Sequence, residues 1–350
     1  MLQKKTLLQN HLLNENCSIK DAFQRLETLS PTLLLLIIND SNKLVGLLTD
    51  GDIRRFLTKE GSMERPVKLA MNPHFQSLNE DNYKIQDLIQ IKDNQLEFIP
   101  IVNEFGIPID LLNLKEQRSL LPIQCVIMAG GKGERLMPLT ENTPKPLLKI
   151  GNKPIIQYNL DLIKLYGIQQ IFITTNYLSE KIDTYITETN QSHIKTVKEP
   201  EILGTIGSLS LIKKGITKDV LLMNSDLLTN IDLEAFYLHF INENADIAVA
   251  CIPYNVEIPY GVMETENFLI KSVKEKPTYT YYSNAGIYLI KKTLIENIPN
   301  SEKIDATTFI EQCIANGKKI VSFPLLSYWL DIGKHEDFNK AQSEVNMINF

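Results

Sequence analysis

The sequence has few cysteines and histidines, and it has no long run of apolar residues. The four cysteines are Cys17, Cys125, Cys251 and Cys313. They are too widely spaced for a metal site or a disulfide framework, which predicts buried thiols in a reducing cytoplasm. The longest aliphatic run, Leu33–Ile38, is far too short to span a bilayer, and the N-terminus turns polar before a signal-type core could form. These shortages predict a cytoplasmic protein without a membrane partner.

An excess of basic residues is also missing. The chain has 36 Lys and Arg against 42 Asp and Glu, a net charge of −6, which argues against a nucleic-acid partner. Its hydrophobic content of 43% and charged content of 22% are ordinary for a globular protein. A length of 350 residues is enough for two domains with real cores.

The first third contains a weak repeat. Ile37–Asp40 recurs 64 residues later as Ile101–Glu104, and Leu47–Leu48 recurs at the same offset as Leu111–Leu112. Each copy predicts a helix, two short strands around a polar turn, and a closing helix. The first helices are expected at Ile19–Thr28 and Tyr83–Lys92, and the turns at Asn39–Lys43 and Asn103–Gly106. Because such units usually pack as pairs, we expect modules at about 1–60 and 61–118, with a linker at 119–123.

The remaining residues, 124–350, alternate between strand and helix patterns. An apolar strand, CVIMAG, ends in glycines, and Pro154 and Gly167 suit the first turn and the C-cap of one helix. Further elements are expected at Gln170–Thr175 (strand), Leu178–Ile186 (helix) and Val220–Asn224 (strand). This alternation predicts an α/β domain with a mostly parallel sheet, whose ligand site lies at the carboxyl ends of the strands.

The stretch MAGGKGERLMPLTENTPKP at residues 128–146 follows the first of these strands. Its glycines are Gly130, Gly131 and Gly133. Glycines after a strand let backbone amides approach phosphate oxygens closely. The spacing matches neither a P-loop nor the G-x-G-x-x-G fingerprint. Arg135 and Lys145 add two cations, and the prolines on both sides of Lys145 would fix its direction. The stretch therefore suits a bound polyphosphate.

The same stretch resembles the signature of sugar-1-phosphate nucleotidyltransferases, G-G-x-G-x-R-L-x-P-L-T followed by P-K-P. Further segments typical of that family follow in order: LGTIGSL at 203–209, NSD at 224–226, PYGV at 259–262, EKP at 275–277, NAGIY at 284–288 and WLDIG at 329–333. The first third resembles a tandem pair of cystathionine-beta-synthase (CBS) modules, most clearly at VGLLTDGDIRR. This order of domains is similar to that of guanylyltransferases of bacterial surface-sugar pathways, such as those that act on glucosamine 1-phosphate in legionaminic acid synthesis.

The resemblance implies a Rossmann-like, GT-A-like domain preceded by an α/β CBS pair, and a homo-oligomer formed through that pair. The reaction would join a nucleoside triphosphate, with GTP favoured, to a sugar 1-phosphate and release pyrophosphate. The sugar phosphate is mostly dianionic at neutral pH, so no general base is needed. The alternatives are a mannose- or heptose-1-phosphate guanylyltransferase, a glucose-1-phosphate thymidylyltransferase, and an inactive nucleotide-sensing regulator.

The resemblance also assigns roles. Arg135 would stabilise the leaving pyrophosphate and Lys145 the α-phosphate, while Asp226 and Asp331 would hold Mg²⁺. Taken alone, Asp226 could instead cap a helix and Asp331 could brace a turn. The nucleotide-binding residues would be Ala129, Gly130, Gly131, Gly133, Glu199, Gly204 and Thr205. The sugar-phosphate residues would be Gly261, Glu275, Lys276, Asn284 and Gly286.

Two further assignments carry open alternatives. Glu199 stands where thymidylyltransferases of the family have a glutamine that faces the base. A carboxylate there suits the adjacent N–H donors of guanine, although Glu199 could also be an exposed acid at a strand end. Gly46, Thr49 and Asp52 match ribose-binding positions of nucleotide-binding CBS modules, although the modules could serve only as a dimer interface. The tyrosines Tyr279, Tyr281 and Tyr282 are expected to pack within a loop.

Overall fold

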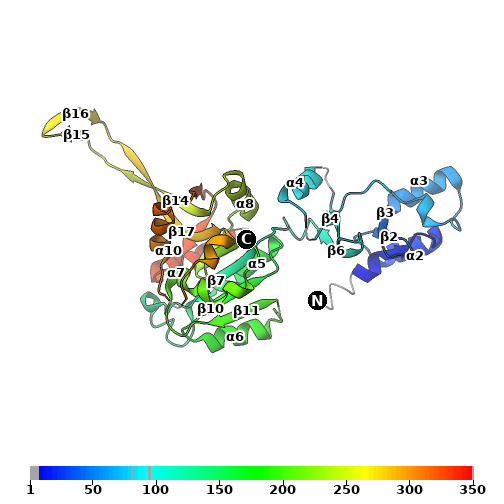
Figure 1. Ribbon diagram of the computed structural model, residues 1–350, viewed down its shortest axis with the longest axis horizontal. Coiled ribbons are helices and arrows are strands. Elements are labelled where there is room, and N and C mark those ends of the chain that lie inside the picture. Colours follow the sequence, from blue (N-terminus) through cyan, green and yellow to red (C-terminus); the bar gives the residue numbers. More distant parts are fainter. Residues whose placement is uncertain (1–7, 81, 94–95, 192, 301, 349–350) are drawn as a thin grey trace. The chain divides into compact units, whose positions relative to one another are not determined.

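The structure is a computed structural model that describes residues 8–80, 82–93, 96–191, 193–300 and 302–348. The chain divides into two compact units, Met1–Leu120 and Leu121–Phe350 (Figure 1). Within the described part of the chain, every helix is too short or too polar to cross a membrane.

The front unit contains two three-stranded sheets with the same plan. The strands are β1 (Leu12–Asn14), β2 (Leu34–Ile38) and β3 (Leu44–Thr49) in one sheet, and β4 (Leu78–Asn79), β5 (Phe98–Val102) and β6 (Pro108–Asn113) in the other. In each sheet the middle strand is parallel to the first and antiparallel to the third. Leu34 pairs with Thr49 and Phe98 with Asn113, and both hairpins are interrupted by a bulge at the equivalent point. The structure therefore repeats at the offset seen in the sequence.

The helices of the front unit are divided unequally between the two repeats, with α2 (Ile19–Thr28) and α3 (Asp50–Glu60) in the first and α4 (Ile85–Asp93) in the second. The prediction of a closing helix in the second copy is wrong, because residues 114–123 form turns and contain no helix. The backbone N–H groups of Glu116 and Gln117 both donate to the carbonyl oxygen of Asn113, and Pro122 follows, so the chain turns away instead of coiling.

The two repeats share one apolar cluster. Its members are Leu8, Leu12, Leu34, Leu36, Leu44 and Leu47 from the first repeat, with Phe98 and Leu111 from the second. The backbone N–H of Leu44 also donates to the carbonyl oxygen of Gly106 at 3.0 Å. Each repeat thus covers an apolar face of the other.

The second unit is built on a seven-stranded sheet. Its strands are β7 (Gln124–Ala129), β10 (Ile171–Thr175), β11 (Ile194–Lys198), β12 (Val220–Asn224), β14 (Ile247–Glu257), β17 (Thr278–Ile290) and β18 (Ile320–Pro324). Their order in the sheet is β11-β10-β7-β12-β17-β14-β18. Within this sheet β17 is antiparallel to both its neighbours, and all other pairs are parallel. The predicted mostly parallel α/β sheet is confirmed.

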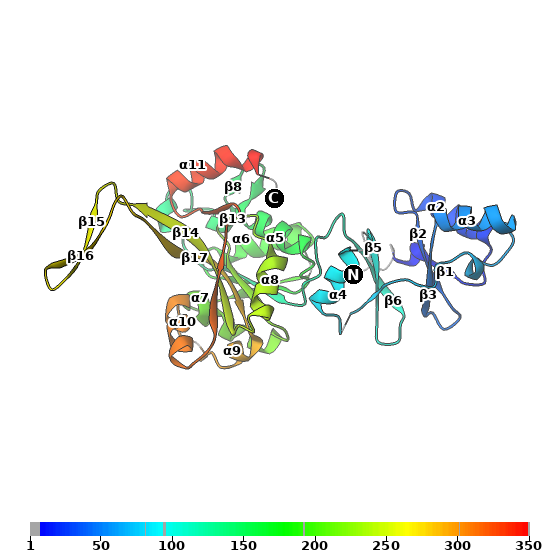
Figure 2. The ribbon, with the colours of Figure 1, turned by 90° about the horizontal axis from the view of Figure 1, so that it is seen from above.

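Helices cover both faces of this sheet (Figures 1 and 2). They are α5 (Ile155–Leu165), α6 (Ser179–Glu188), α7 (Gly204–Gly207), α8 (Leu233–Asn242), α9 (Lys292–Glu296) and α10 (Ala306–Ala315). A further helix, α11 (His335–Glu344), packs through Ala341 in a separate apolar cluster with Leu330 and Ile332. On one face Val126, Leu222 and Tyr288 of the sheet belong to the same buried cluster as Leu294 of α9 and Phe309 of α10. This burial removes the apolar strands from water and holds the sheet rigid beneath the loops at its edge.

Smaller strand pairs complete the unit. They are β8 (Lys149–Ile150) with β9 (Lys153–Pro154), β13 (Leu227–Thr229) with β19 (Trp329–Asp331), and β15 (Val262–Glu266) with β16 (Leu269–Lys274). Beyond the seven-stranded sheet, β14 and β17 continue as a two-stranded ribbon that carries β15 and β16 (Figures 1 and 2). We call residues 252–283 the arm.

The arm corrects one expectation. Tyr279, Tyr281 and Tyr282 lie within β17 and not in a loop, and Tyr281 and Tyr282 are 60% and 61% exposed. The run TYTYY combines β-branched and aromatic residues, a composition typical of strands. The prediction of a packed loop was wrong because it overlooked this strand-like composition.

Candidate active site

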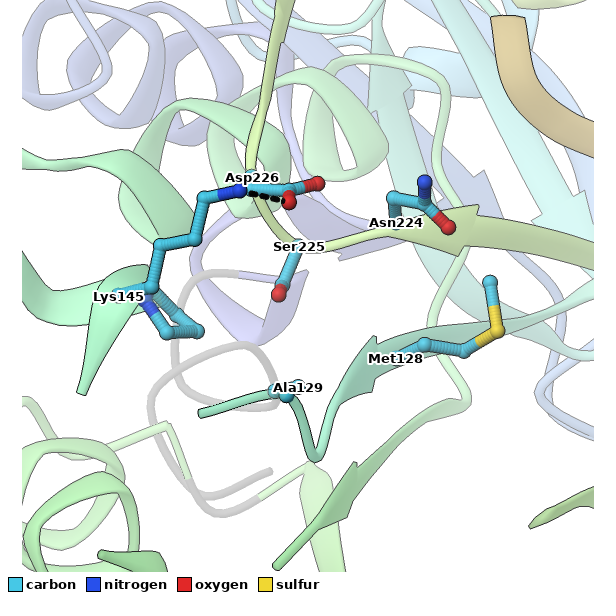
Figure 3. A pocket seen from close by; sticks show the side chains of 8 residues that line it. Met128, Ala129, Lys145, Asn224, Ser225 and Asp226 are labelled. Atoms are coloured by element: carbon cyan, nitrogen blue, oxygen red, sulfur yellow. Dashed lines mark hydrogen bonds and ion pairs between the residues drawn. The ribbon is translucent and has the colours of Figure 1, made fainter. Parts of the chain in front are cut away.

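A cavity lies at the carboxyl ends of β7 and β12. These strands are neighbours in the sheet, but the chain first passes from β7 to β10 and β11 on one side before it reaches β12 on the other. Such a switch point is where α/β sheets usually bind ligands. The cavity has a volume of about 190 Å³ and is lined by Met128, Ala129, Gly131, Lys145, Pro146, Asn224, Ser225 and Asp226 (Figure 3).

Lys145 is buried in this cavity, with 9% of its surface exposed. It opens a short 3₁₀ turn, Lys145–Leu147, between two prolines that fix the backbone on either side. Its ammonium group pairs with the carboxylate of Asp226 (Figure 3) and lies 3.9 Å from Oδ1 of Asp331. The cation is therefore held between two carboxylates.

The two carboxylates come from paired strands. Leu227 pairs with Asp331, and the N–H of Ile332 donates to the carbonyl oxygen of Asp226 at 3.1 Å. Burial raises the pKa of Asp331, and the neighbouring charge of Asp226 raises that pKa further against the opposing effect of Lys145. Asp226 precedes strand β13, so its alternative role as a helix cap is wrong, and Asp331 is the last residue of β19.

The aspartates also fit a metal ion. Oδ1 of Asp226 and Oδ1 of Asp331 are both buried without a hydrogen-bond partner, an arrangement that is costly unless something binds there. Among the described residues, no group of three or more His, Cys, Asp or Glu side chains could hold a metal by itself. Mg²⁺ is usually bound by one or two carboxylates together with water and substrate phosphates, so this pair suits Mg²⁺ bound jointly with a polyphosphate.

A larger cavity of about 600 Å³ adjoins the first. It is lined by Gly131, Lys132, Gly133, Glu134, Arg135, Lys145, Ile202, Asp226 and Gly333. A Cβ atom added to Gly333 would lie in ordinary contact, 3.5 Å from Nη2 of Arg135, so the guanidinium lies beside the WLDIG segment. Because both cavities share Gly131, Lys145 and Asp226, the glycine loop, both predicted cations and one predicted metal ligand line one continuous site.

Glu199 lies against the glycine loop. It follows β11, is only 5% exposed, and accepts a hydrogen bond at Oε2 from the N–H of Leu203 at 3.2 Å. A Cβ atom at Gly130 would lie 2.9 Å from Oε1 of Glu199, so this close approach requires glycine. Burial raises the pKa of Glu199, although the N–H of Leu203 opposes that shift. The alternative of an exposed acid at a strand end is wrong.

Among the remaining predicted nucleotide and sugar residues, some adjoin a cavity and others do not. Gly204 and Thr205 begin α7 and line neither cavity. Gly286, at φ +71°, sits so close to Asn224 that a Cβ would lie 2.6 Å from Nδ2 of that cavity residue. The side chain of Asn284 accepts a hydrogen bond from the N–H of Gly286 at 2.9 Å. Asn284 and Gly286 therefore adjoin the smaller cavity.

Three predicted sugar residues are placed elsewhere. Gly261, Glu275 and Lys276 are exposed residues of the arm and line neither cavity. Gly261 and Glu275 are close to each other, since a Cβ at Gly261 would lie 3.2 Å from Oε2 of Glu275. The structure brings the glycine loop, the two cations and the two aspartates together, but neither Gly204 and Thr205 nor these three sugar residues line the cavities.

Some lining residues were not predicted. Ser225 donates its N–H to the carbonyl oxygen of Met128 at 3.1 Å and so ties β12 to β7, and Nδ2 of the buried Asn159 donates to the carbonyl oxygen of Ser225 at 3.2 Å. Asn224, Ser225 and Gly333 lie in the NSD and WLDIG segments, of which only the acids were singled out. Nothing in the sequence pointed to Ile202.

In the front unit, the proposed ribose-binding residues make structural contacts. Thr49 is the N-cap of α3, and its hydroxyl donates to Oδ2 of Asp52 at 2.6 Å. Oδ1 of Asp52 accepts from Arg55 at 2.5 Å. A Cβ at Gly46 would lie 2.5 Å from the sulfur of Met71. The N–H of Thr49 also donates to Oδ2 of Asp52 at 2.9 Å, and the N–H of Asp52 donates to the hydroxyl oxygen of Thr49 at 3.3 Å, so the two residues form a capping box that stabilises the helix start.

The sequence matches two known families. The profile of the family described as nucleotidyl transferase matches residues 124–347, and the profile described as CBS domain matches residues 11–59. The chain is 31% identical over 229 residues to the D-glycero-alpha-D-manno-heptose 1-phosphate guanylyltransferase of Aneurinibacillus thermoaerophilus, covering 64% of this chain and 98% of that protein. It is 32% identical over 234 residues to the mannose-1-phosphate guanyltransferase of Schizosaccharomyces pombe, covering 62% of each chain.

A solved structure has the same fold. It is a Bacillus anthracis protein described as a glucose-1-phosphate thymidylyltransferase, with a TM-score of 0.52 and 23% sequence identity, and the match covers 65% of this chain and 97% of that one. At this identity the similarity concerns the fold and not the substrate.

Proposed function

Because the chain belongs to the nucleotidyl transferase family, we propose that it transfers GMP from GTP to a sugar 1-phosphate and releases pyrophosphate, with glucosamine 1-phosphate as the favoured acceptor. The chain is a sugar-1-phosphate nucleotidyltransferase with an N-terminal CBS domain. The observation that supports the proposed reaction, nucleotidyl transfer with release of pyrophosphate, is the position of Lys145 between Asp226 and Asp331, beside the glycine loop at the switch point of the sheet.

The residues of the site would act by positioning and by charge. The sugar phosphate supplies its own nucleophilic oxygen, because its second pKa is about 6 and it is mostly dianionic at neutral pH. The amides of the Gly130–Gly133 loop would hold the triphosphate, with Lys145 at the α-phosphate and Arg135 at the departing pyrophosphate. Mg²⁺, bound by Asp226 and Asp331, would neutralise phosphate charge as a Lewis acid.

The preference for guanine rests on Glu199. A buried carboxylate can accept from both the ring N–H and the amino group of guanine, and that bonding would offset the burial that raises its pKa. Uracil and thymine present one N–H between two carbonyl oxygens, which a carboxylate would repel. Glu199 would thus favour GTP and disfavour UTP and dTTP.

The Glu199→Gln variant is expected to lose much of this preference. Loss of a charge-assisted pair of hydrogen bonds should reduce the free-energy preference for GTP over the pyrimidine nucleotides by about 1.5–3 kcal/mol. The kcat/KM for UTP or dTTP should therefore approach that for GTP. Glu201→Gln is the matched control, because Glu201 is an exposed acid two residues further along the chain. A nucleotide profile that does not change would leave Glu199 without a role at the base and favour the thymidylyl alternative.

A substrate panel tests the function itself. Each of GTP, ATP, UTP and dTTP would be combined with glucosamine, mannose, heptose and glucose 1-phosphates, with pyrophosphate release as the readout. The highest kcat/KM is expected for GTP with glucosamine 1-phosphate. The names of the heptose and mannose relatives support those two sugars as second candidates. If no pair releases pyrophosphate while nucleotides still bind, the chain is a sensor and not an enzyme.

A further inference from the structure

Within its own unit, the described residues leave an apolar surface of the arm uncovered. At its outer end β15 and β16 form a two-stranded sheet of their own. Isolated two-stranded hairpins are at best marginally stable in water, and both strands of this one also present an open edge. Ten large apolar or aromatic side chains of the arm are more than a third exposed. They are Tyr254, Val256, Tyr260, Met263, Phe268, Leu269, Ile270, Val273, Tyr281 and Tyr282.

The two faces of the hairpin differ in chemistry. Met263 pairs with Val273 and Thr265 with Ile270, and because side chains alternate along a strand these four share one side, which we call the apolar face. Met263, Ile270 and Val273 are 53%, 61% and 56% exposed. The apolar face thus presents three unburied aliphatic side chains together.

The opposite face holds the charged residues of the hairpin, which pair with one another, together with Val262 and Leu269. Lys274 contacts Glu264 at 2.5 Å, and Glu264 also accepts a hydrogen bond from the hydroxyl of Ser272. Lys271, at the bulge, contacts Glu266 at 3.3 Å. Because the charged groups of this face already pair within the hairpin, no partner is needed to neutralise them. The apolar face is therefore the side that a partner would cover.

The inner part of the arm has a similar two-sided character. Tyr254 pairs with Tyr281 and Val256 with Tyr279, so these four share one side of the ribbon. On the other side, Thr280 donates a hydrogen bond to Asn255 at 2.9 Å. This second side also carries Tyr282, which pairs with Pro253, so the ribbon is less sharply divided than the hairpin.

The tip of the arm holds an unusual residue. The turn between β15 and β16 consists of Asn267 and Phe268, at φ +48° and +66°. Two positive φ values in a row are typical of Asn-Gly turns, and a bulky aromatic residue is strained there. Phe268 is also fully exposed. Among the described residues of this unit, the strained Phe268 side chain gains no packing, which is the pattern expected of a side chain kept for an outside contact.

We propose that the apolar face of the arm pairs with the same face of the arm in a second copy of this chain. The charge of the arm favours this partner. Residues 252–283 contain four glutamates and three lysines, a net charge of −1, so two copies would meet without strong repulsion. A lipid surface or a nucleic acid would call for a basic excess that the arm lacks. A two-fold contact between identical faces is the commonest way in which soluble chains associate.

Self-association of the full-length protein tests this contact without any substrate. Sedimentation velocity over a range of concentrations should give a dissociation constant that rises about 100-fold or more in Ile270→Lys, because each dimer loses two buried apolar side chains and gains two charges. Leu269→Lys is the matched control. Leu269 is the adjacent residue, is 65% exposed, and lies on the opposite side of the same strand, so its variant should associate like the wild type.

Phe268→Gly separates association from folding. Glycine relieves the strain of the Asn267–Phe268 turn, so hydrogen exchange of the arm amides should be no faster than in the wild type, while the dissociation constant should rise about 10-fold or more. The proposal is overturned if the wild type does not self-associate, if Ile270→Lys and Phe268→Gly both associate normally, or if Leu269→Lys weakens association as much as Ile270→Lys.

Discussion

Asp226→Ala is expected to lower kcat by about 10²–10³, the scale for removing one preorganised electrostatic group from an active site. The carboxylate of Asp226 is the partner of the buried Lys145, and its second oxygen is free to bind Mg²⁺. The variant should lose both the metal ligand and the group that directs the lysine. For the same reason, EDTA should abolish pyrophosphate release by the wild type, and added Mg²⁺ should restore it.

The control for this variant is Asp246→Ala. Asp246 also pairs with a lysine, Lys291, at 3.3 Å, but it precedes β14 and so lies at the opposite end of that strand from the site. Its removal should leave kcat within about two-fold of the wild type. Asp226→Ala should also melt at a lower temperature, because Lys145 loses its paired charge, so both variants are assayed well below their melting points. Near-normal turnover by Asp226→Ala would mean that the site lies elsewhere.

Arg135→Ala is expected to lower kcat by a similar factor of about 10²–10³. Arg135 is the sole arginine between residues 121 and 350, so no neighbouring guanidinium can replace its forked donors. In the reverse reaction, which consumes pyrophosphate, the KM for pyrophosphate should rise as well. Arg135→Lys should recover only part of the activity, since a lysine restores the charge without the planar fork.

The control for Arg135 is an exposed cation away from the cavities. Lys153 pairs with Asp161 at 2.7 Å on the surface and lines neither cavity, so Lys153→Ala should keep kcat and the KM for pyrophosphate unchanged. If Arg135→Ala binds pyrophosphate as well as the wild type does, Arg135 has no part in holding the leaving group.

The part of the sheet formed by β7, β10 and β12 could be predicted because these strands are short and apolar and have helices between them in the sequence. The predicted strand Val220–Asn224 coincides with β12, and the strand predicted at Gln170–Thr175 is β10 with one residue fewer. The arm could not be predicted in this way. Residues 262–274 form strands that bury neither face, so they carry only a weak alternation of apolar and polar residues.

The site was partly predictable for a related reason. Lys145, Arg135 and Asp226 follow strand ends that the pattern located, and the parallel sheet brings such ends together. Two features depend on long-range packing that a sequence does not display. One is the burial of Glu199 against Gly130, and the other is the arrangement of Gly261, Glu275 and Lys276 on the arm and not at the cavities.

The apolar cluster shared by the two repeats of the front unit has a consequence for how that unit folds. Leu34 and Leu36 of the first repeat are buried, and the half-buried Phe98 and Leu111 of the second repeat pack against them. Either repeat alone would expose this surface, so neither should be a stable species, and the unit should unfold in one cooperative step. A chain cut near residue 70 would therefore yield two aggregation-prone fragments, whereas a cut at the unit boundary after Leu120 would leave this cluster whole.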